Sequence, residues 1–321
     1  MSKDCDFEHV PVLFNECMEA LNIDPDGLYV DCTAGGGGHS LGIVKRLTGR
    51  GKLISLDKDV DALRACMMKQ MSEGISNDKW ILVKSDFSDI RNVIDGMKLG
   101  KVNGILADLG VSSHQIDTPE RGFSYVNDGP LDMRMDTNLH LTAEIVVNTY
   151  REDELERIFR YYGQDRYAGR IASCIVADRK TEPFRSTLQL ANKIARYMPT
   201  KGRNEDQHPA RRCFQALRIE VNGELNALEK LLRDGADVLK EGGRFAVISF
   251  HSLEDRIVKE TFRKLEDPCT CPRDLPMCVC GKRSKGKVLT KKPITAGEEE
   301  VEDNSRAHCC KLRVFERNGV I

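Results

Sequence analysis

The chain has 321 residues, with 49 lysines and arginines against 50 aspartates and glutamates, so its formal net charge is −1. This length allows one large domain or two smaller ones around a buried core. The balanced charge means that any affinity for nucleic acid must come from local basic patches. No apolar run approaches the ~20 residues that a membrane helix needs, and the N-terminal segment lacks signal-peptide character. We therefore expect a protein without a membrane partner.

Twelve cysteines are spread along the chain. Small secreted scaffolds that depend on disulfides are far shorter than this chain. Most of these cysteines lie in apparent core segments, where a thiol packs as a small hydrophobe. A reducing compartment, and hence a cytoplasmic location, is the interpretation that fits both observations.

Strands and helices alternate up to about residue 108. We expect strands at 28–32, 52–57, 80–84 and 102–108, and helices between them at 40–47, 60–71 and 88–97. This alternation is typical of a parallel sheet with crossover helices.

Helix-like segments without an intervening strand follow a long loop. They lie at 142–148, 153–161, 166–179 and 188–197, and helical character continues through 212–239. A strand at 244–250, a helix at 253–264 and a final strand at 313–317 then return to the sheet pattern. The predicted organisation is a first domain part at 1–112, a helical insertion at 113–212 that recognises the substrate, and a second part at 213–321 with a tail rich in Cys and Lys.

A glycine-rich turn links the first predicted strand to the first predicted helix. Residues 30–40 read Val-Asp-Cys-Thr-Ala-Gly-Gly-Gly-Gly-His-Ser, and Asp57 closes the next strand. Glycines let the backbone approach a ligand, and the helix start presents free N–H groups. A carboxylate at the tip of the second strand is placed to accept both hydroxyls of a ribose. The pattern predicts a ligand that contains adenosine, and the alternative is a glycine-rich turn without a ligand.

The glycine register narrows the class of ligand. The dinucleotide fingerprint Gly-x-Gly-x-x-Gly/Ala does not fit, because its last position falls on Ser40 or Leu41. A phosphate-binding loop of the Walker type would need a lysine, which is missing here. The spacing Asp-x-Thr-x-Gly-x-Gly over residues 31–37 instead looks like the first motif of S-adenosylmethionine-dependent methyltransferases.

The fourth strand ends in Asp108, at the sheet edge where open α/β sheets bind their ligands. Methyltransferases that act on amines usually carry Asp/Asn/Ser-Pro-Pro-Tyr/Phe at this point. Here only the Asp remains, because Leu109 and Gly110 replace the two prolines. The spacing alone predicts an S-adenosylmethionine enzyme with an unusual target site.

Six motifs in order make the resemblance specific. They are Asp31-x-Thr33-x-Gly35-Gly36-Gly37-Gly38-His39-Ser40, Asp108-Leu-Gly-Val-Ser-Ser113, Glu120-Arg-Gly-Phe-Ser124, Asp128-Gly-Pro-Leu-Asp-Met-Arg-Met-Asp136, His208-Pro-Ala210 and Ser249-Phe-His-Ser-Leu-Glu-Asp-Arg256. Together they resemble the RsmH/MraW family of bacterial 16S ribosomal RNA cytosine-N4 methyltransferases, over residues 9–317.

The resemblance implies a class I, Rossmann-like α/β methyltransferase fold with a helical insertion. It also implies transfer of a methyl group from S-adenosyl-L-methionine to N4 of one cytidine, position 1402, in the decoding centre of 16S rRNA. The expected partner is 16S rRNA within the small ribosomal subunit. The oligomeric state expected for the protein is either a monomer or a homodimer.

The resemblance assigns the cofactor contacts to seven residues: Gly37, Gly38, His39, Asp57, Phe87, Asp108 and Gln115. The physical interpretation agrees for most of them, since a ring after the third strand can stack on adenine. Alternatives remain for two residues: Phe87 as a core side chain and His39 as a capping or packing residue. Gln115 rests on the resemblance alone.

The predicted catalytic residues are Asp108, Asp132, Arg134 and His251. The lone pair of cytosine N4 is delocalised into the ring, so oxygen acceptors for its protons would make the amine a better nucleophile. Asp108 is placed either to accept those protons or to bind the methionine amine. Asp132 and Arg134 would contact cytosine edges or RNA phosphates, or form a salt-bridged loop over the cofactor. His251 and Ser252 are further pocket candidates, with helix capping by Ser252 as the alternative.

Basic residues cluster in the tail, at Lys282, Arg283, Lys285, Lys287, Lys291 and Lys292, and Arg211-Arg212 follow His208-Pro209. These groups either bind RNA or form solvated surface. The tail also holds Cys269, Cys271, Cys278 and Cys280, which could bind a tetrahedral zinc ion, although Cys-x-Cys is tighter than the usual spacing. We expect thiols without a metal and keep zinc as the alternative.

Two other functions remain open on the sequence. One is an RNA-binding assembly factor that keeps a methyltransferase fold without catalysis. The other is a methyltransferase for a small-molecule amine, which a large helical insertion makes less fitting. An assembly factor would not transfer a methyl group to ribosomal RNA. A small-molecule methyltransferase would methylate free nucleosides.

Overall fold

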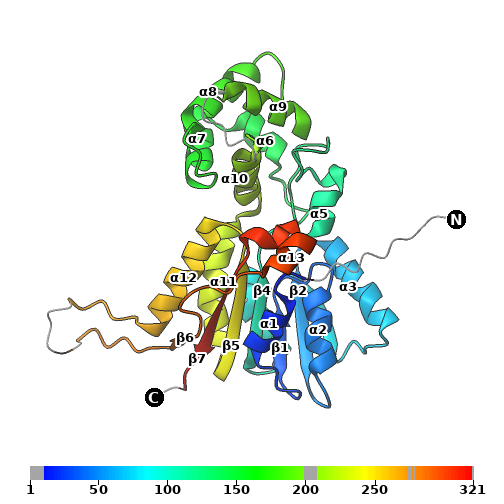
Figure 1. Ribbon diagram of the computed structural model, residues 1–321, viewed down its shortest axis with the longest axis vertical. Coiled ribbons are helices and arrows are strands. Elements are labelled where there is room, and N and C mark those ends of the chain that lie inside the picture. The colour runs from blue at the N-terminus through cyan, green and yellow to red at the C-terminus, as the bar shows by residue number, and fades with distance from the viewer. Residues whose placement is uncertain (1–10, 199–207, 273–276, 278, 320–321) are drawn as a thin grey trace. The chain divides into compact units, whose positions relative to one another are not determined.

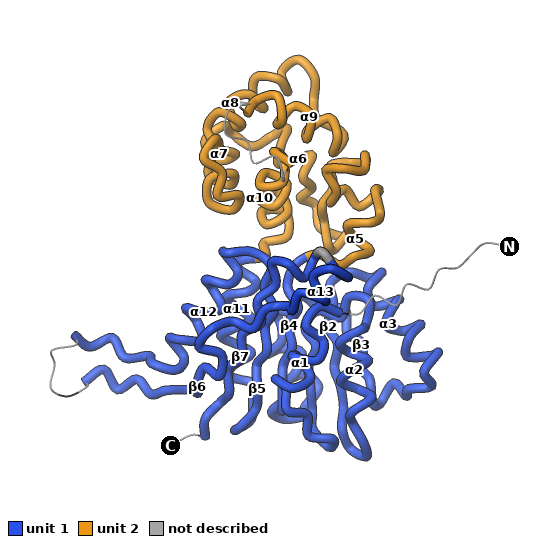
Figure 2. Tube along the Cα trace, viewed as in Figure 1, with its two compact units in different colours: residues 1–110, 225–321 blue, residues 111–224 orange. Residues whose placement is uncertain are grey.

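The computed structural model describes residues 11–198, 208–272, 277 and 279–319. Contacts divide the chain into two compact units, the first formed by residues 1–110 and 225–321 and the second by residues 111–224 (Figure 2). The second unit extends beyond the predicted insertion, 113–212, because helix α10 (Arg211–Asn222) packs against helices within it.

The first unit is built on a seven-stranded sheet (Figure 1). Its strands are β1 (Leu28–Asp31), β2 (Lys52–Asp57), β3 (Trp80–Lys84), β4 (Val102–Asp108), β5 (Leu239–Ser249), β6 (Gly286–Val288) and β7 (Lys311–Arg317). Their order is β3-β2-β1-β4-β5-β7-β6, with β1 to β5 parallel and β7 antiparallel to both its neighbours. The predicted α/β, Rossmann-like class is confirmed, and the first four strands lie where the alternation predicts them.

Helices cover both faces of this sheet. They are α1 (Phe14–Leu21), α2 (Gly38–Arg46) and α3 (Val60–Ser72) on one face, and α4 (Ile90–Met97), α11 (Glu224–Val238) and α12 (Ser252–Glu266) on the other. Side chains alternate along the strands, so Tyr29 and Leu106 pack with the first set while Val30 and Ile105 pack with the second. A short helix, α13 (Glu298–Asp303), precedes β7. The sequence analysis did not predict α1, α13 or β6.

The helical character expected over 212–239 is confirmed, but it is divided between two helices. Gly223 separates α10 from α11, and its φ of 60° lies in the left-handed region, where a side chain would be strained. Its N–H donates to the carbonyl of Glu220, which closes the last turn of α10. A glycine inside a helical hydrophobic pattern therefore acted as a C-terminal stop.

The second unit is helical, as expected. It contains α5 (Ser113–Asp117), α6 (Ala143–Thr149), α7 (Glu152–Tyr161), α8 (Ala168–Asp178), α9 (Thr187–Tyr197) and α10. Apolar residues of α6 to α10 form its core, together with Leu131 and Met133 from the loop before α6. Thr142 and Ser186 cap α6 and α9 by accepting from backbone N–H groups. Within the described part of the chain, no helix has both the length and the apolar character to cross a membrane.

Candidate functional site

Three strands of the first unit end in a carboxylate at the same edge of the sheet. Asp31 ends β1, Asp57 ends β2 and Asp108 ends β4. The strand order reverses between β1 and β4, because the chain runs outward through β2 and β3 and then returns to β4. Such a switch point is where open α/β sheets bind ligands.

A glycine turn joins β1 to α2, as the sequence predicts, although α2 begins at Gly38 rather than at Ser40. Gly35 and Gly37 have φ values of 50° and 76°, and Gly37 directly precedes the first residue of α2. A Cβ built on Gly36 would meet no atom within 4 Å, so the turn has open space beside it. Gly38 is different, because its Cβ would lie 2.3 Å from Pro11. Close packing of the chain, rather than open space, requires glycine at that position.

Asp57 is tied to the glycine turn. Its Oδ2 accepts from the N–H of Gly35 at 2.9 Å, and its Oδ1 accepts from the N–H of Asp59 at 2.9 Å. Burial raises the pKa of this carboxyl to about 6, although both hydrogen bonds favour the ionised form. Each carboxylate oxygen can accept a further hydrogen bond. Asp57 is therefore a fixed, partly exposed acceptor of the kind that a vicinal diol requires.

A buried polar network below the turn was not predicted from the sequence. The Ser40 hydroxyl donates to Asp31 at 2.6 Å and lies 2.8 Å from the Ser55 hydroxyl, which accepts from the Trp80 indole at 2.8 Å. Complete burial raises the pKa of Asp31 to about 7. Asp31 belonged to the quoted motif, but only the fold shows that it anchors α2 rather than facing the open space.

Asp108 lies beside His39 at the end of β4. Its backbone N–H donates to the Thr33 hydroxyl at 2.7 Å, which joins the ends of β1 and β4. Its Oδ2 is 3.6 Å from Nδ1 of His39, and its Oδ1 is buried and has no hydrogen-bond partner among the described residues. Burial, reinforced by the nearby Asp31 and Glu254, raises the pKa of Asp108 to about 8. A carboxyl with an unpartnered oxygen is ready to receive a cationic or hydrogen-bond-donating ligand.

His39 is almost entirely buried, with 5% of its surface exposed. Its Nε2 lies 3.1 Å from the carbonyl of Val12, and its ring stacks on Phe14 with centroids 6.1 Å apart. Burial lowers its pKa to about 4, so the ring is neutral at pH 7 and carries its proton on Nε2, facing that carbonyl. These contacts are those of the packing alternative. Contact with the cofactor remains a prediction for this residue.

Phe87 follows β3, at the same edge of the sheet. It is half-buried against the core and begins a short 3-10 turn after Asp86. The Lys58 ammonium lies 5.8 Å from the centre of its ring and pairs with Asp86 at 3.2 Å. Burial raises the pKa of Asp86, but Lys58 and hydrogen bonds from Ser88 outweigh it and leave a net lowering. One face of the aromatic ring is thus paired with a cation.

The end of β5 is organised by Glu254. This buried carboxylate accepts from the N–H of Phe250 at 2.9 Å, and its Oε1 lies 3.1 Å from Nε2 of His251. His251 is the N-cap of α12, since its Nδ1 accepts from the N–H of Glu254. Capping by Ser252, kept as an alternative, is therefore wrong: Ser252 is the first helical residue. The motif that contains Glu254 was quoted, but its supporting role was missed.

Asp132 and Arg134, in the second unit, form a bidentate ion pair. The Arg134 Nε and Nη2 donate to the two Asp132 oxygens at 2.8 and 2.6 Å, and its Nη1 donates to the carbonyls of Thr137 and Leu139. Burial raises the pKa of Asp132, but the hydrogen bonds and charge of Arg134 outweigh it, so the pKa is lowered overall. The pair has the geometry of the salt-bridged loop that we kept as an alternative.

Asn222, which the sequence analysis missed, holds this loop from α10. Its amide donates to the carbonyl of Met133 at 2.8 Å and accepts from the N–H of Met135 at 2.8 Å. Gln115, predicted as a cofactor contact, is 4% exposed and forms a reciprocal capping box with Ser112 at the start of α5. The side-chain oxygen of Gln115 accepts from the N–H of Ser112 at 3.1 Å.

Some candidate RNA-binding side chains already have acidic partners. Lys285 pairs with Asp237 at 2.6 Å and Lys287 with Glu316 at 3.6 Å. The remaining basic residues named from the sequence are exposed: Arg211, Arg212, Lys282, Arg283, Lys291 and Lys292.

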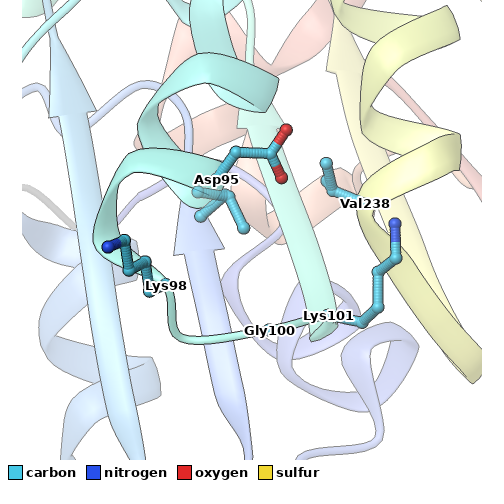
Figure 3. A pocket seen from close by; sticks show the side chains of 6 residues that line it. Asp95, Lys98, Gly100, Lys101 and Val238 are labelled. Atoms are coloured by element: carbon cyan, nitrogen blue, oxygen red, sulfur yellow. The ribbon is translucent and has the colours of Figure 1, made fainter.

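A depression of about 310 Å³ lies away from these carboxylates (Figure 3). Asp95, Lys98, Lys101 and Val238 line it, and Lys101 directly precedes β4. It is therefore at the amino end of β4, whereas Asp108 is at the carboxyl end. The strand-end carboxylates, rather than this depression, form the candidate site.

Comparisons with known proteins point to one family of methylases. The model of the MraW methylase family matches residues 6–318. A protein of Carboxydothermus hydrogenoformans named ribosomal RNA small subunit methyltransferase H is 54% identical over 312 residues, covering 97% of this chain and 98% of that protein. The protein of the same name from Clostridioides difficile is 49% identical over 312 residues, with 97% and 99% covered.

Two of the matching solved structures share far less sequence identity with this chain. A putative rRNA-methylase from Clostridium thermocellum is 10% identical, with a TM-score of 0.46 and coverage of 96% of this chain and 98% of that one. A putative methyltransferase from Streptococcus mutans in complex with SAH is also 10% identical, with a TM-score of 0.44 and coverage of 96% and 99%. The sheet order and its switch point, rather than these likenesses, define the fold.

Proposed function

This chain belongs to the MraW methylase family, and we propose that it transfers a methyl group from S-adenosyl-L-methionine to N4 of one cytidine in small-subunit ribosomal RNA. The predicted family is confirmed. The observation that carries the proposal is the pair of strand-end carboxylates, Asp57 and Asp108, on the two sides of the switch point. The choice of N4, of a single cytidine and of position 1402 in the decoding centre follows the sequence resemblance.

Residues of the first unit fit this cofactor on two counts. Asp57 offers partly exposed acceptors for the ribose hydroxyls beside a turn that leaves open space at Gly36. Asp108 offers a buried oxygen that lacks a partner within the described chain. Phe87 would stack on the adenine, and Gly37 and Gly38 would complete the contacts of this unit. A cofactor role for Gln115, which belongs to the second unit, follows from the sequence resemblance alone. When bound, S-adenosylmethionine supplies a methyl group on a positively charged sulfur.

Asp108 is the residue that we place nearest to the chemistry. In one role it holds the ammonium of the cofactor, and in the other it accepts an N4 proton and so increases the electron density on the amine. His39 stays neutral and supports Asp108 from the side, with Nδ1 3.6 Å from Oδ2. We assign His39 to positioning Asp108, and His251 to shaping the end of β5 together with Glu254.

The second unit would recognise RNA by shape and phosphate contacts. The N–H groups of Arg134 donate hydrogen bonds to Asp132 and to loop carbonyls. We therefore assign this ion pair to holding the loop in a defined conformation. Arg211 is exposed and available to phosphates, whereas the exposed Arg212 already donates from Nη1 to the carbonyl of Gln164 at 3.1 Å. The partner would be 16S rRNA within the small subunit, and the location would be the cytoplasm, where such subunits are assembled.

Nucleoside mass spectrometry of small-subunit RNA tests the proposal. We expect N4-methylcytidine to disappear from one site when the gene is deleted and to return with the wild-type chain. Asp108→Asn, if folded, should restore RNA binding but little methylation. Cofactor binding without any change in the RNA would indicate an assembly factor, and efficient methylation of free cytidine would indicate a small-molecule enzyme.

A further inference from the structure

The described residues between α12 and β6 (267–272, 277 and 279–285), here called the arm, project from the edge of the sheet (Figure 1). None of its described residues is buried, and Met277 and Val279 are 77% and 79% exposed. Apolar burial therefore contributes little to the order of this arm. Small segments without a core commonly depend on a disulfide or a metal ion.

Three cysteine sulfurs meet in this arm. The Sγ atoms of Cys269, Cys271 and Cys280 all lie within 4.8 Å of one another, and those of Cys269 and Cys280 are 3.9 Å apart. Sulfurs bound at about 2.3 Å to a tetrahedral zinc ion are about 3.8 Å apart, whereas a disulfide joins them at about 2.05 Å. The observed separation matches the edge of a coordination tetrahedron. Cys278, named with them from the sequence, lies outside the described residues.

The surroundings of the sulfurs suit bound thiolates. The N–H of Val279 points at Sγ of Cys271, 3.4 Å away, and such backbone donors orient coordinating ligands. The Lys282 ammonium donates to the Thr270 hydroxyl at 3.3 Å, which keeps a positive charge beside the cluster. Three thiolates and one divalent zinc ion carry a net charge of −1, which a neighbouring lysine offsets.

We propose that Cys269, Cys271 and Cys280 bind a structural zinc ion that orders the arm. Each thiol gives up its proton to solvent when it coordinates the metal. Zinc fits because sulfur ligands in a tetrahedral arrangement select soft metals, and zinc needs no redox partner. A water molecule or a fourth side chain completes the coordination. This site is independent of methyl transfer, since none of its residues belongs to the candidate active site.

Metal analysis of the full-length chain tests the site. After purification under reducing conditions with zinc present, we expect one zinc per chain by elemental mass spectrometry, with iron and copper near background. Cys269→Ser and Cys280→Ser should each lose most of this zinc. Cys309→Ser is the matched control, because Cys309 is also exposed but lies outside the cluster, and it should retain the metal. No bound zinc, or full zinc retention in both cluster variants, would overturn the proposal.

Three further measurements test the identity of the metal site and its effect on the arm. Cobalt exchanged into the site should show charge-transfer bands from at least three thiolates and the strong visible bands of tetrahedral geometry, and fewer thiolates would refute the site. A Cys269–Cys280 disulfide in the freshly purified chain, found by non-reducing peptide mapping, would also refute it. Removal of zinc by a chelator should accelerate trypsin cleavage after Lys282 and Arg283 at least several-fold. An unchanged cleavage rate would show that the metal does not order the arm.

Discussion

The partly buried carboxyl of Asp108 should make cofactor binding strongly dependent on pH. Its pKa is raised to about 8 by burial, so most of the ligand-free protein carries a protonated Asp108 at pH 7. If the ammonium of S-adenosylmethionine pairs with this group, only the ionised form binds well. Rising pH then increases the affinity up to the pKa of the free protein.

The magnitude follows from the ionised fraction. With a pKa of about 8, Asp108 is ionised in about 1% of molecules at pH 6 and about 9% at pH 7. Apparent affinity scales with the competent fraction, so it should rise about nine-fold over this interval. Asp57, with a pKa of about 6, contributes at most a further factor of about two. The cofactor's own amine, with an ordinary pKa of about 7.7–8.0, stays protonated at both pH values.

Isothermal titration calorimetry at pH 6 and pH 7 measures this difference, and repeating it in buffers of different ionisation enthalpy counts the protons released. We expect the wild type to release close to one proton per cofactor at pH 7. In Asp108→Asn the affinity should change between these pH values only by the factor of about two that Asp57 contributes, and almost no protons should be released on binding. A pH-independent affinity in the wild type, or an equal dependence in Asp108→Asn, would refute this pairing. Asp108 would then be left with the target amine as its partner.

The structure supports four further predictions. Asp57→Ala should lower cofactor affinity by about 1.5–3 kcal/mol, through loss of charge-assisted hydrogen bonds, whereas Asp95→Ala, an exposed carboxylate control, should leave calorimetric affinity unchanged. The pKa of Asp108 in the folded protein lies above its unfolded value of 3.8, so the native state binds more protons than the unfolded state. The free energy of unfolding measured in urea should therefore fall as the pH rises from 6 to 8, and it should fall less steeply in Asp108→Asn. Asn222→Ala should destabilise the protein by about 1–3 kcal/mol in urea, because the backbone groups of Met133 and Met135 lose a buried partner; an equal midpoint would argue against this role. Binding of the protein to the small ribosomal subunit should weaken as the salt concentration rises. If Arg211 contacts a phosphate, Arg211→Ala should reduce the slope of log affinity against log salt by about 1.

Local patterns in the sequence were sufficient for the parallel sheet. The alternation of apolar strands with amphipathic helices placed β2, β3 and β4 at their observed bounds, because period and turn residues are properties of neighbours in the chain. The same applies to the glycine turn between β1 and α2, whereas the hydrogen bond from Gly35 to Asp57 was not predicted and follows from the pairing of β1 with β2. Family membership also followed from the order of short motifs.

Tertiary structure decided what each polar side chain does, because burial and partners come from segments far apart in the chain. The sequence shows Asp31 and Asp108 as equivalent strand ends. In the structure, Asp31 accepts a hydrogen bond from Ser40, whereas Asp108, beside His39, keeps an oxygen without a partner among the described residues. Likewise, two cysteine pairs of unusual spacing became a candidate metal site only when three sulfurs were found within 4.8 Å of one another. Hydrogen-bond partners and the cost of burying a charge depend on distances in space, which a one-dimensional pattern does not contain.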